Sequence, residues 1–157
     1  DENDTVIDLY FKKIYPTAVN SVLEVCDLFR SGNPPHRIQD ESLATYERRC
    51  TKKHALIDWN KPVNQVYNLI RGTNPAPGAW TRYKDTVVSI FDCEKAEGDG
   101  ISGRIVDISG QGVTVQCIGG RILIKRVKPD ADSKQSAEAW ASMSDLSVGE
   151  HLGNLNS

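Results

Sequence analysis

Apolar residues near the start of the chain recur at the spacing of two amphipathic helices. Thr5 or Asp4 can cap a first helix that runs to about residue 15, and Pro16 then falls in the first turn of a second helix, where a proline is tolerated. Gly32 is placed to end that second helix as a C-terminal cap. The apolar positions of the second helix follow the spacing of one buried face, and they are Val19, Val22, Leu23, Cys26 and Phe29.

A third amphipathic helix is predicted between Asn60, which can cap it, and Gly72, which ends it. The polar, weakly periodic stretch 36–53 is expected to cross a surface as a linker, pinned by Leu43 and Tyr46. The buried face of the third helix is predicted to hold Val63, Val66, Tyr67 and Ile70.

From residue 79 onward the pattern becomes that of short β-strands. In the stretch 113–117 apolar and polar residues alternate, which is typical of a strand buried on one face. Gly119-Gly120 is expected to form a two-residue hairpin turn, residues 97–100 a flexible loop, and the end of the chain a short helix and a polar tail. Five antiparallel strands can remove their unpaired edges by closing into a small barrel of the OB type. The predicted strands are 79–83, 86–91, 104–108, 113–117 and 121–127, and the short helix is 136–143.

The composition fits a protein that buries a core. Of the 157 residues 39% are hydrophobic and 25% charged, and the net charge is −2. A free-standing nucleic-acid binder usually carries a clear basic excess, so any such role needs a local patch. No apolar run approaches the roughly 20 residues that cross a bilayer, so we expect a soluble, cytoplasmic protein with no membrane partner.

The cysteines indicate free thiols rather than a metal site. No two of them lie close enough in sequence to form a CxxC pair, and no secretory signal is recognisable. The loop acids Glu94, Glu97 and Asp99 lack the spacing of a metal site, so no metal is expected. The four cysteines are Cys26, Cys50, Cys93 and Cys117.

Three separated blocks carry a resemblance to a known family. They are ATY at 44–46, IDW at 57–59 and LIRGTNPAPGAW at 69–80. In order and spacing they resemble the C-terminal portion of the 10-formyltetrahydrofolate-dependent formyltransferases. That family includes methionyl-tRNA formyltransferase, 10-formyltetrahydrofolate hydrolase/dehydrogenase and the sugar-amine formyltransferases.

The resemblance implies an α+β fold in three parts. Residues 1–32 would be the terminal helices of a Rossmann-like catalytic domain, 33–54 a linker, and 55–157 an OB-like β-barrel C-terminal domain. The family's catalytic Asn, His and Asp, and its 10-formyltetrahydrofolate site, lie in the first domain, and no residue here matches that trio. The chain also begins without a methionine, so we expect it to be part of a longer protein and inactive alone.

The resemblance leaves the reaction open. Transfer of a formyl group to an amine, on methionyl-tRNA, is the first expectation, and the Asn74-Pro75 pair resembles the transferase pattern. Hydrolysis of the same folate is the alternative, because Arg71-Gly72 and the stretch 77–80 resemble the hydrolase. A third hypothesis, from another class, is a non-catalytic OB-type module that binds RNA.

Candidate binding residues are confined to one basic stretch without an acid, which is Arg121, Lys125, Arg126 and Lys128. Basic strands of OB-like barrels often follow a phosphate backbone, and in methionyl-tRNA members of the family the C-terminal domain helps to hold the tRNA. An ordinary solvated strand edge has the same composition, and no aromatic residue is interleaved.

Other polar residues favour structural interpretations. His36, His54 and His151 have no predictable carboxylate partner and are expected to be surface residues. Trp59 is expected to anchor the linker on the barrel, with Asp58 accepting hydrogen bonds near the start of the third helix. The apolar face within residues 1–32 would be exposed if its own domain is absent, and the chain could then self-associate through it.

Overall fold

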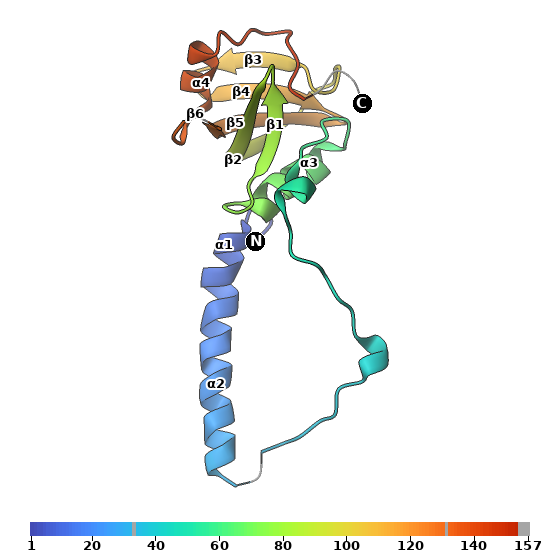
Figure 1. Cartoon of the computed structure of the whole chain (residues 1–157), viewed down its shortest axis with the longest axis vertical. Helices are drawn as coiled ribbons and strands as arrows, with labels where there is room; N and C mark the ends of the chain where they lie inside the picture. Colours follow the sequence, from blue (N-terminus) through green and yellow to red (C-terminus); the bar gives the residue numbers. More distant parts are fainter. Residues whose placement is uncertain (33, 131, 154–157) are drawn as a thin grey trace. The chain divides into compact units, whose positions relative to one another are not determined.

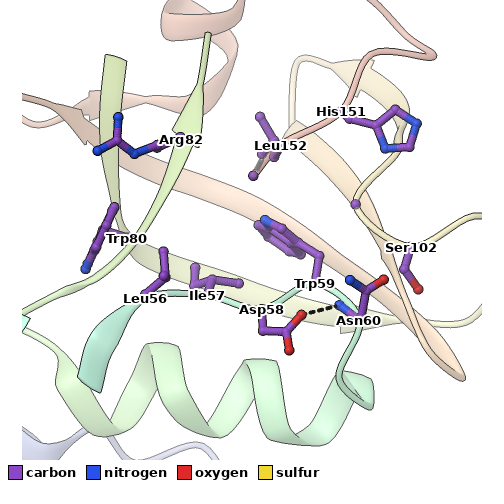
Figure 2. Close-up of a pocket in the computed structure, with 12 residues that line it drawn as sticks. Leu56, Ile57, Asp58, Trp59, Asn60, Trp80, Arg82, Ser102, His151 and Leu152 are labelled. Carbon is purple, nitrogen blue, oxygen red and sulfur yellow. Dashed lines mark hydrogen bonds between the residues drawn. The ribbon is translucent and has the colours of Figure 1, made fainter. Parts of the chain in front are cut away.

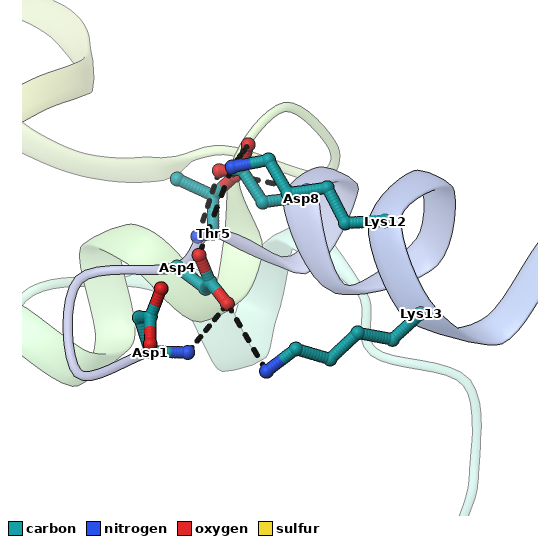
Figure 3. Close-up of polar contacts among 6 residues, drawn as sticks. All are labelled: Asp1, Asp4, Thr5, Asp8, Lys12 and Lys13. Atoms are coloured by element: carbon teal, nitrogen blue, oxygen red, sulfur yellow. Dashed lines mark hydrogen bonds and ion pairs between the residues drawn. The ribbon is translucent and has the colours of Figure 1, made fainter.

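One helical run dominates the first of the chain's two units, Asp1–Arg49. The computed structural model describes residues 1–32, 34–130 and 132–153. Thr5 caps helix α1 (Val6–Leu9) in a reciprocal capping box with Asp8, and Lys12 pairs with the Asp8 carboxylate at 2.9 Å (Figure 3). The hydrogen bond from the Thr5 hydroxyl, followed by that from Lys12, lowers the pKa of Asp8 well below its usual range.

The two helices expected before residue 32 are continuous. A π-turn, η1 (Tyr10–Ile14), joins α1 to α2 (Tyr15–Arg30), in whose first turn Pro16 lies as predicted. Proline has no N–H and its ring crowds the carbonyl four residues earlier, so a wider turn before it lets the helix continue. Gly32, at a φ of +85°, donates its N–H to the carbonyl of Phe29 and provides the predicted cap.

The rest of this unit is extended, apart from the 3₁₀ turn η2 (Glu41–Leu43). The side chains of Leu43 and Tyr46 are 77% and 86% exposed, so they do not pack within this unit. That they pin the segment on another surface stays a prediction.

The second unit, Cys50–Ser157, contains an antiparallel sheet in the order β1-β2-β5-β4-β3, with the short β6 beside β5 (Figure 1). Helix α3 packs on β1, β2 and β5, and α4 packs on β3, β4 and β5. The predicted strands and the short helix are confirmed with shifted ends. Their bounds are β1 (Ala79–Tyr83), β2 (Thr86–Ala96), β3 (Ile105–Ser109), β4 (Gly112–Cys117), β5 (Gly120–Pro129), β6 (Gln135–Ser136), α3 (Val63–Thr73), α4 (Ala137–Met143) and the 3₁₀ turn η3 (Lys52–Ala55).

The predicted capping of α3 needs correction. Its N-cap residue is Pro62, not Asn60, and the helix continues one residue beyond Gly72. Asn60 is instead part of a turn, in which its backbone N–H donates to the Asp58 carboxylate at 2.9 Å. The predicted buried positions Val66, Tyr67 and Ile70 are confirmed.

The predicted closed barrel is replaced by an open sheet whose edges are covered by irregular chain. No ladder joins β1 to β3 among the described residues. A C-terminal segment, residues 149–153, lies along both edges: Gly149 N donates to Ile105 O of β3, and Gly153 N donates to Arg82 O of β1. The expected polar tail is thus partly structural, and it satisfies edge groups that a sixth full strand would otherwise pair.

A network around Glu150 holds this C-terminal segment. The Tyr83 hydroxyl donates to Glu150 Oε2 at 2.8 Å, and Ser147 N donates to the same oxygen at 2.7 Å. These bonds lower the pKa of Glu150, that of Ser147 having the larger effect, whereas burial raises the pKa of Tyr83. The Tyr83 ring also meets Trp140 of α4 edge-on, with centroids 5.9 Å apart.

Strand β4 is more buried than its alternation predicted. All six of its residues are buried, including Gln116 at 0% exposure. Gln116 Nε2 lies within 2.9 Å of three carbonyl oxygens, those of Gly98, Cys117 and Gly120, and Arg121 Nε donates to its Oε1 at 3.0 Å. A glutamine can be buried here because the loop 97–100 and Arg121 satisfy its amide.

Candidate functional site

The 69–80 block, which carries much of the family resemblance, makes structural contacts. Asn74 Nδ2 donates at 2.7 Å to the carbonyl of Phe91, which lies in a bulge of β2 where the register with β5 shifts. Trp80 Nε1 donates to the carbonyl of Lys52 at 2.7 Å. The block therefore joins α3 to the sheet. Its polar side chains donate to backbone carbonyls that accept no hydrogen bond from a neighbouring strand.

Trp59 anchors the connecting segment as predicted. It is 3% exposed, and its Nε1 donates to Thr81 Oγ1 at 3.0 Å. Asp58 remains exposed, accepting from Asn60 N and lying 3.9 Å from the Lys61 ammonium. The Asp58 carboxylate therefore bonds to the turn before α3 and not to the first amides of that helix.

The four cations of the basic stretch lie outside the core because β5 contains a bulge. Ile122 and Ile124, at even-numbered positions of β5, are buried, but the next buried apolar residue is Val127, at an odd-numbered position. The register shift between β2 and β5 falls between them, so Lys125 and Arg126 both avoid the core. Without a bulge one of the two would point inward.

These cations are not equally free. Arg121 Nε donates to Gln116 Oε1, and Lys125 forms a hydrogen-bonded ion pair with Glu94 of β2. The hydrogen bond to Glu94 raises the pKa of Lys125. Arg126 and Lys128 are exposed.

The neighbouring strand adds acids that the basic stretch itself lacks. Asp92 lies opposite Arg126, and Glu94 lies opposite Leu123 next to Lys125. Lys134, which directly precedes β6, adds a cation whose ammonium lies 3.8 Å from the centroid of the Phe91 ring of β2. Sequence reasoning missed these neighbours, because only the pairing of β2 with β5 brings them together.

The histidines are not grouped. His36 and His54 are exposed, and His54 Nδ1 accepts from the backbone N–H of Thr51 at 3.1 Å. His151, expected near a free tail, is half-buried and lines a pocket. Nothing in the local sequence signals that position, which depends on the path of the C-terminal segment.

The pocket, of about 650 Å³, opens between β1, the segment 56–60 and the C-terminal segment (Figure 2). Trp80 and Leu56 form an apolar side, and Arg82, Ser102 and His151 contribute polar groups. Within the described residues, none of these three polar side chains forms a hydrogen bond or an ion pair. The backbone around the pocket is already paired, since Ile57 N donates to Trp80 O at 2.8 Å.

Two negative findings apply to the part of the chain that the structure describes. It contains no helix of the length and apolarity that a bilayer crossing requires. It also contains no group of three or more His, Cys, Asp or Glu side chains arranged to hold a metal ion.

The four cysteines are free thiols. Cys26 and Cys50 are exposed, whereas Cys117 is buried and Cys93 is half-buried beside the core. Desolvation raises the pKa of both Cys93 and Cys117 to about 12.

The sheet with its two packed helices defines a formyltransferase-type C-terminal domain, and the family comparison agrees. Residues 49–144 match the family "Formyl transferase, C-terminal domain", and the chain belongs to this family. Methionyl-tRNA formyltransferase of Ruminiclostridium cellulolyticum is 36% identical over 128 residues, which are 79% of this chain and 41% of that protein. The same enzyme of Geotalea daltonii is 28% identical over 86% of this chain and 43% of its own length.

Solved structures show the same fold. A variant of HypX from Aquifex aeolicus superposes with a TM-score of 0.75 over 94% of this chain and 27% of its own length, at 18% identity. HypX in complex with tetrahydrofolic acid gives a TM-score of 0.69 at 18% identity, over 85% of this chain and 24% of that one. The chain spans less than half the length of the two curated relatives above.

Proposed function

We propose that this chain is the C-terminal portion of a cytoplasmic, 10-formyltetrahydrofolate-dependent formyltransferase that formylates the amine of methionyl-tRNA. The observation that carries the proposal is the family match over residues 49–144, together with relatives named methionyl-tRNA formyltransferase. The folate and the catalytic groups then belong to parts of the protein beyond these 157 residues.

The described side chains support an accessory role. Formyl transfer passes through a tetrahedral intermediate that needs an oxyanion donor and a proton-transferring group. Of the three histidines, His36 is exposed in a loop, His54 is used in a turn, and His151 has no carboxylate partner among the described residues. We therefore assign no catalytic residue to this chain.

The 157-residue chain is expected to transfer no formyl group from 10-formyltetrahydrofolate to methionyl-tRNA. It is also expected not to hydrolyse the folate. Both are measured by chromatography of the formylated methionine and of tetrahydrofolate, with the full-length relative from Ruminiclostridium cellulolyticum as positive control. Turnover above the enzyme-free rate would place catalytic groups within the chain and would refute the accessory role.

The tRNA partner is proposed to bind along β5 through Lys125, Arg126 and Lys128. The Lys125–Glu94 ion pair does not prevent this, because the Glu94 side chain is 60% exposed and such pairs contribute little. A phosphate can replace Glu94 as the partner of Lys125. We exclude Arg121 from the contact set, because Gln116 holds its guanidinium.

Replacing both Lys125 and Arg126 with alanine is expected to weaken tRNA binding and to reduce the slope of log affinity against log salt by about 2, or about 1 per lost phosphate contact. Glu94→Gln should strengthen binding, since it frees Lys125 and removes an acid. The measurement is a filter-binding or anisotropy titration at several salt concentrations.

The matched control is the double variant Lys53→Ala/Arg104→Ala. Both residues are exposed, and neither forms an ion pair with another described residue. Equal losses in the two double variants would show that only net charge matters and would remove tRNA binding from β5.

We also propose that residues 1–32 pair with a second copy of the chain when no other domain covers them. Apolar side chains of this helical run are widely exposed, including Val22 at 62%, Leu23 at 59% and Phe29 at 66%. Pairing removes such a surface from water.

A further inference from the structure

We infer that the pocket between β1 and the C-terminal segment binds a nucleoside phosphate, with the base on Trp80 and Leu56 and the phosphate on Arg82. The inference goes beyond the proposed function. It uses none of the β5 cations, and it holds or fails independently of tRNA binding there.

The apolar side of the pocket is flat and held in place. Trp80 is fixed by the hydrogen bond from its Nε1 to the carbonyl of Lys52. Leu56, 49% exposed, pairs with Trp80 as a parallel bridge and extends the wall beside the indole. Every nucleobase has a π-face, so a fixed indole next to an aliphatic side chain suits base stacking.

The cation lies where the phosphate of a stacked nucleotide can reach it. Trp80 and Arg82 are two residues apart on β1, so their side chains leave the same face of the strand. Figure 2 shows them as neighbours on one side of the pocket. The Lys52 ammonium lies 5.7 Å from the centroid of the Trp80 ring and 3.7 Å from Asp130 Oδ1, in an exposed ion pair that a phosphate can compete with.

The polar groups of the pocket remain available for a ligand. The Arg82 guanidinium, the Ser102 hydroxyl and the His151 ring have no hydrogen-bond or ion-pair partner among the described residues, and all three line the pocket. Arginine offers a planar fork of donors that matches a phosphate. Asp58, on the same segment as Leu56, is exposed; its carboxylate accepts from Asn60 N and has further acceptor capacity for the amino group of a base.

Simpler ligands use only part of this surface. A free inorganic anion would contact Arg82 but leave the Trp80 and Leu56 wall in water. An uncharged aromatic molecule would leave Arg82 without a counter-charge. A cavity of about 650 Å³ is of the size that holds a nucleotide-sized molecule.

The test uses the full 157-residue chain and the indole N–H signals of its tryptophans in nuclear magnetic resonance. The probes are adenosine monophosphate, adenosine, inorganic phosphate and a short single-stranded RNA. The signal of Trp80, assigned by its loss in Trp80→Phe, is expected to shift with the nucleotide or with the RNA. The signal of Trp140, which is 2% exposed and lies outside the pocket, serves as an internal control and should stay in place.

Two substitutions separate the base from the phosphate. Arg82→Gln is expected to weaken binding of adenosine monophosphate about tenfold and to leave adenosine unaffected. Trp80→Leu is expected to weaken both by about tenfold. Arg104→Gln is the matched control, because it removes one exposed cation outside the pocket and should change nothing.

A response to the free nucleotide identifies a small-molecule site, and a response to RNA alone identifies a strand-bound nucleotide; both support the inference. It is overturned if neither probe shifts the Trp80 signal, or if Arg82→Gln and Arg104→Gln behave alike. Arg82 is exposed and its side chain has no partner among the described residues, so its substitution leaves a folded protein even if Trp80→Leu does not. Loss of tRNA binding in the β5 variants, with the pocket unchanged, separates the two proposals.

Discussion

Replacing Gln116 with leucine is expected to lower the free energy of unfolding of the second unit by about 2–4 kcal/mol. Leucine fills a similar volume but cannot donate to the carbonyls of Gly98, Cys117 and Gly120 or accept from Arg121. Each net hydrogen bond contributes about 1 kcal/mol, and the Arg121 guanidinium would lose its fixed acceptor. Because Gln116 is fully buried, water cannot replace these bonds.

The effect is measured by urea unfolding followed by circular dichroism. Gln111→Leu is the matched control, since Gln111 is exposed in the turn between β3 and β4 and its change should stay within about 0.5 kcal/mol. Equal midpoints for the two variants would mean that the Gln116 contacts add nothing to stability. Arg121→Ala should destabilise the protein as well, whereas Lys125→Ala should not, which separates the structural cation from the proposed binding cations.

The same substitution also tests how the pocket is held. The backbone carbonyl of Gln116, which the substitution keeps, accepts from Gly103 N at 2.9 Å. Gly103 and its neighbour Ser102 line the pocket. Loosening of the loop before them should broaden the Trp80 indole signal and weaken nucleotide binding, without touching a residue proposed to contact the ligand. The side chain of Gln116 holds Gly98 and its backbone carbonyl holds Gly103, so one residue contacts both the loop predicted to be flexible and the pocket.

Local patterns predicted most elements of the second unit, because each depends on neighbours in sequence. The buried face of α3 with Val66 and Ile70 is of this kind, and so is the cap of α1 by Thr5 in the first unit. The hairpin turn shifted by one residue, to Ile118-Gly119, because Gly120 already pairs with Cys117 in the ladder.

Features that depend on pairing distant segments were not predictable in the same way. The alternation in 113–117 correctly identified a strand, but full burial of Gln116 requires a loop and an arginine from elsewhere. The bulge that turns Arg126 outward depends on the pairing of β5 with β2, and the acids that face the β5 cations lie on β2. The sheet stays open rather than closing into a barrel because the C-terminal segment covers both edges, and its polar composition gave no sign of that role.

At neutral pH the rates at which an alkylating reagent modifies the four cysteines are expected to differ by large factors. Burial raises the pKa of Cys93 and Cys117 to about 12. A pKa of about 12 in place of about 9 lowers the reactive thiolate fraction about a thousandfold. Cys26 and Cys50 are exposed and should react first. Mass spectrometry of the labelled peptides gives the four rates.

The comparison between the two fast thiols tests the proposed pairing of residues 1–32. Cys26 lies among the exposed apolar side chains of α2, whereas Cys50 lies at the start of the second unit. If a second copy covers that face, the labelling rate of Cys26 falls as protein concentration rises, while that of Cys50 stays constant. A charge introduced by Val22→Glu should restore fast labelling of Cys26, because burying an unpaired carboxylate in the contact is costly. Equal rates for the two cysteines at every concentration would show that the apolar face remains open to water and that the pairing does not occur.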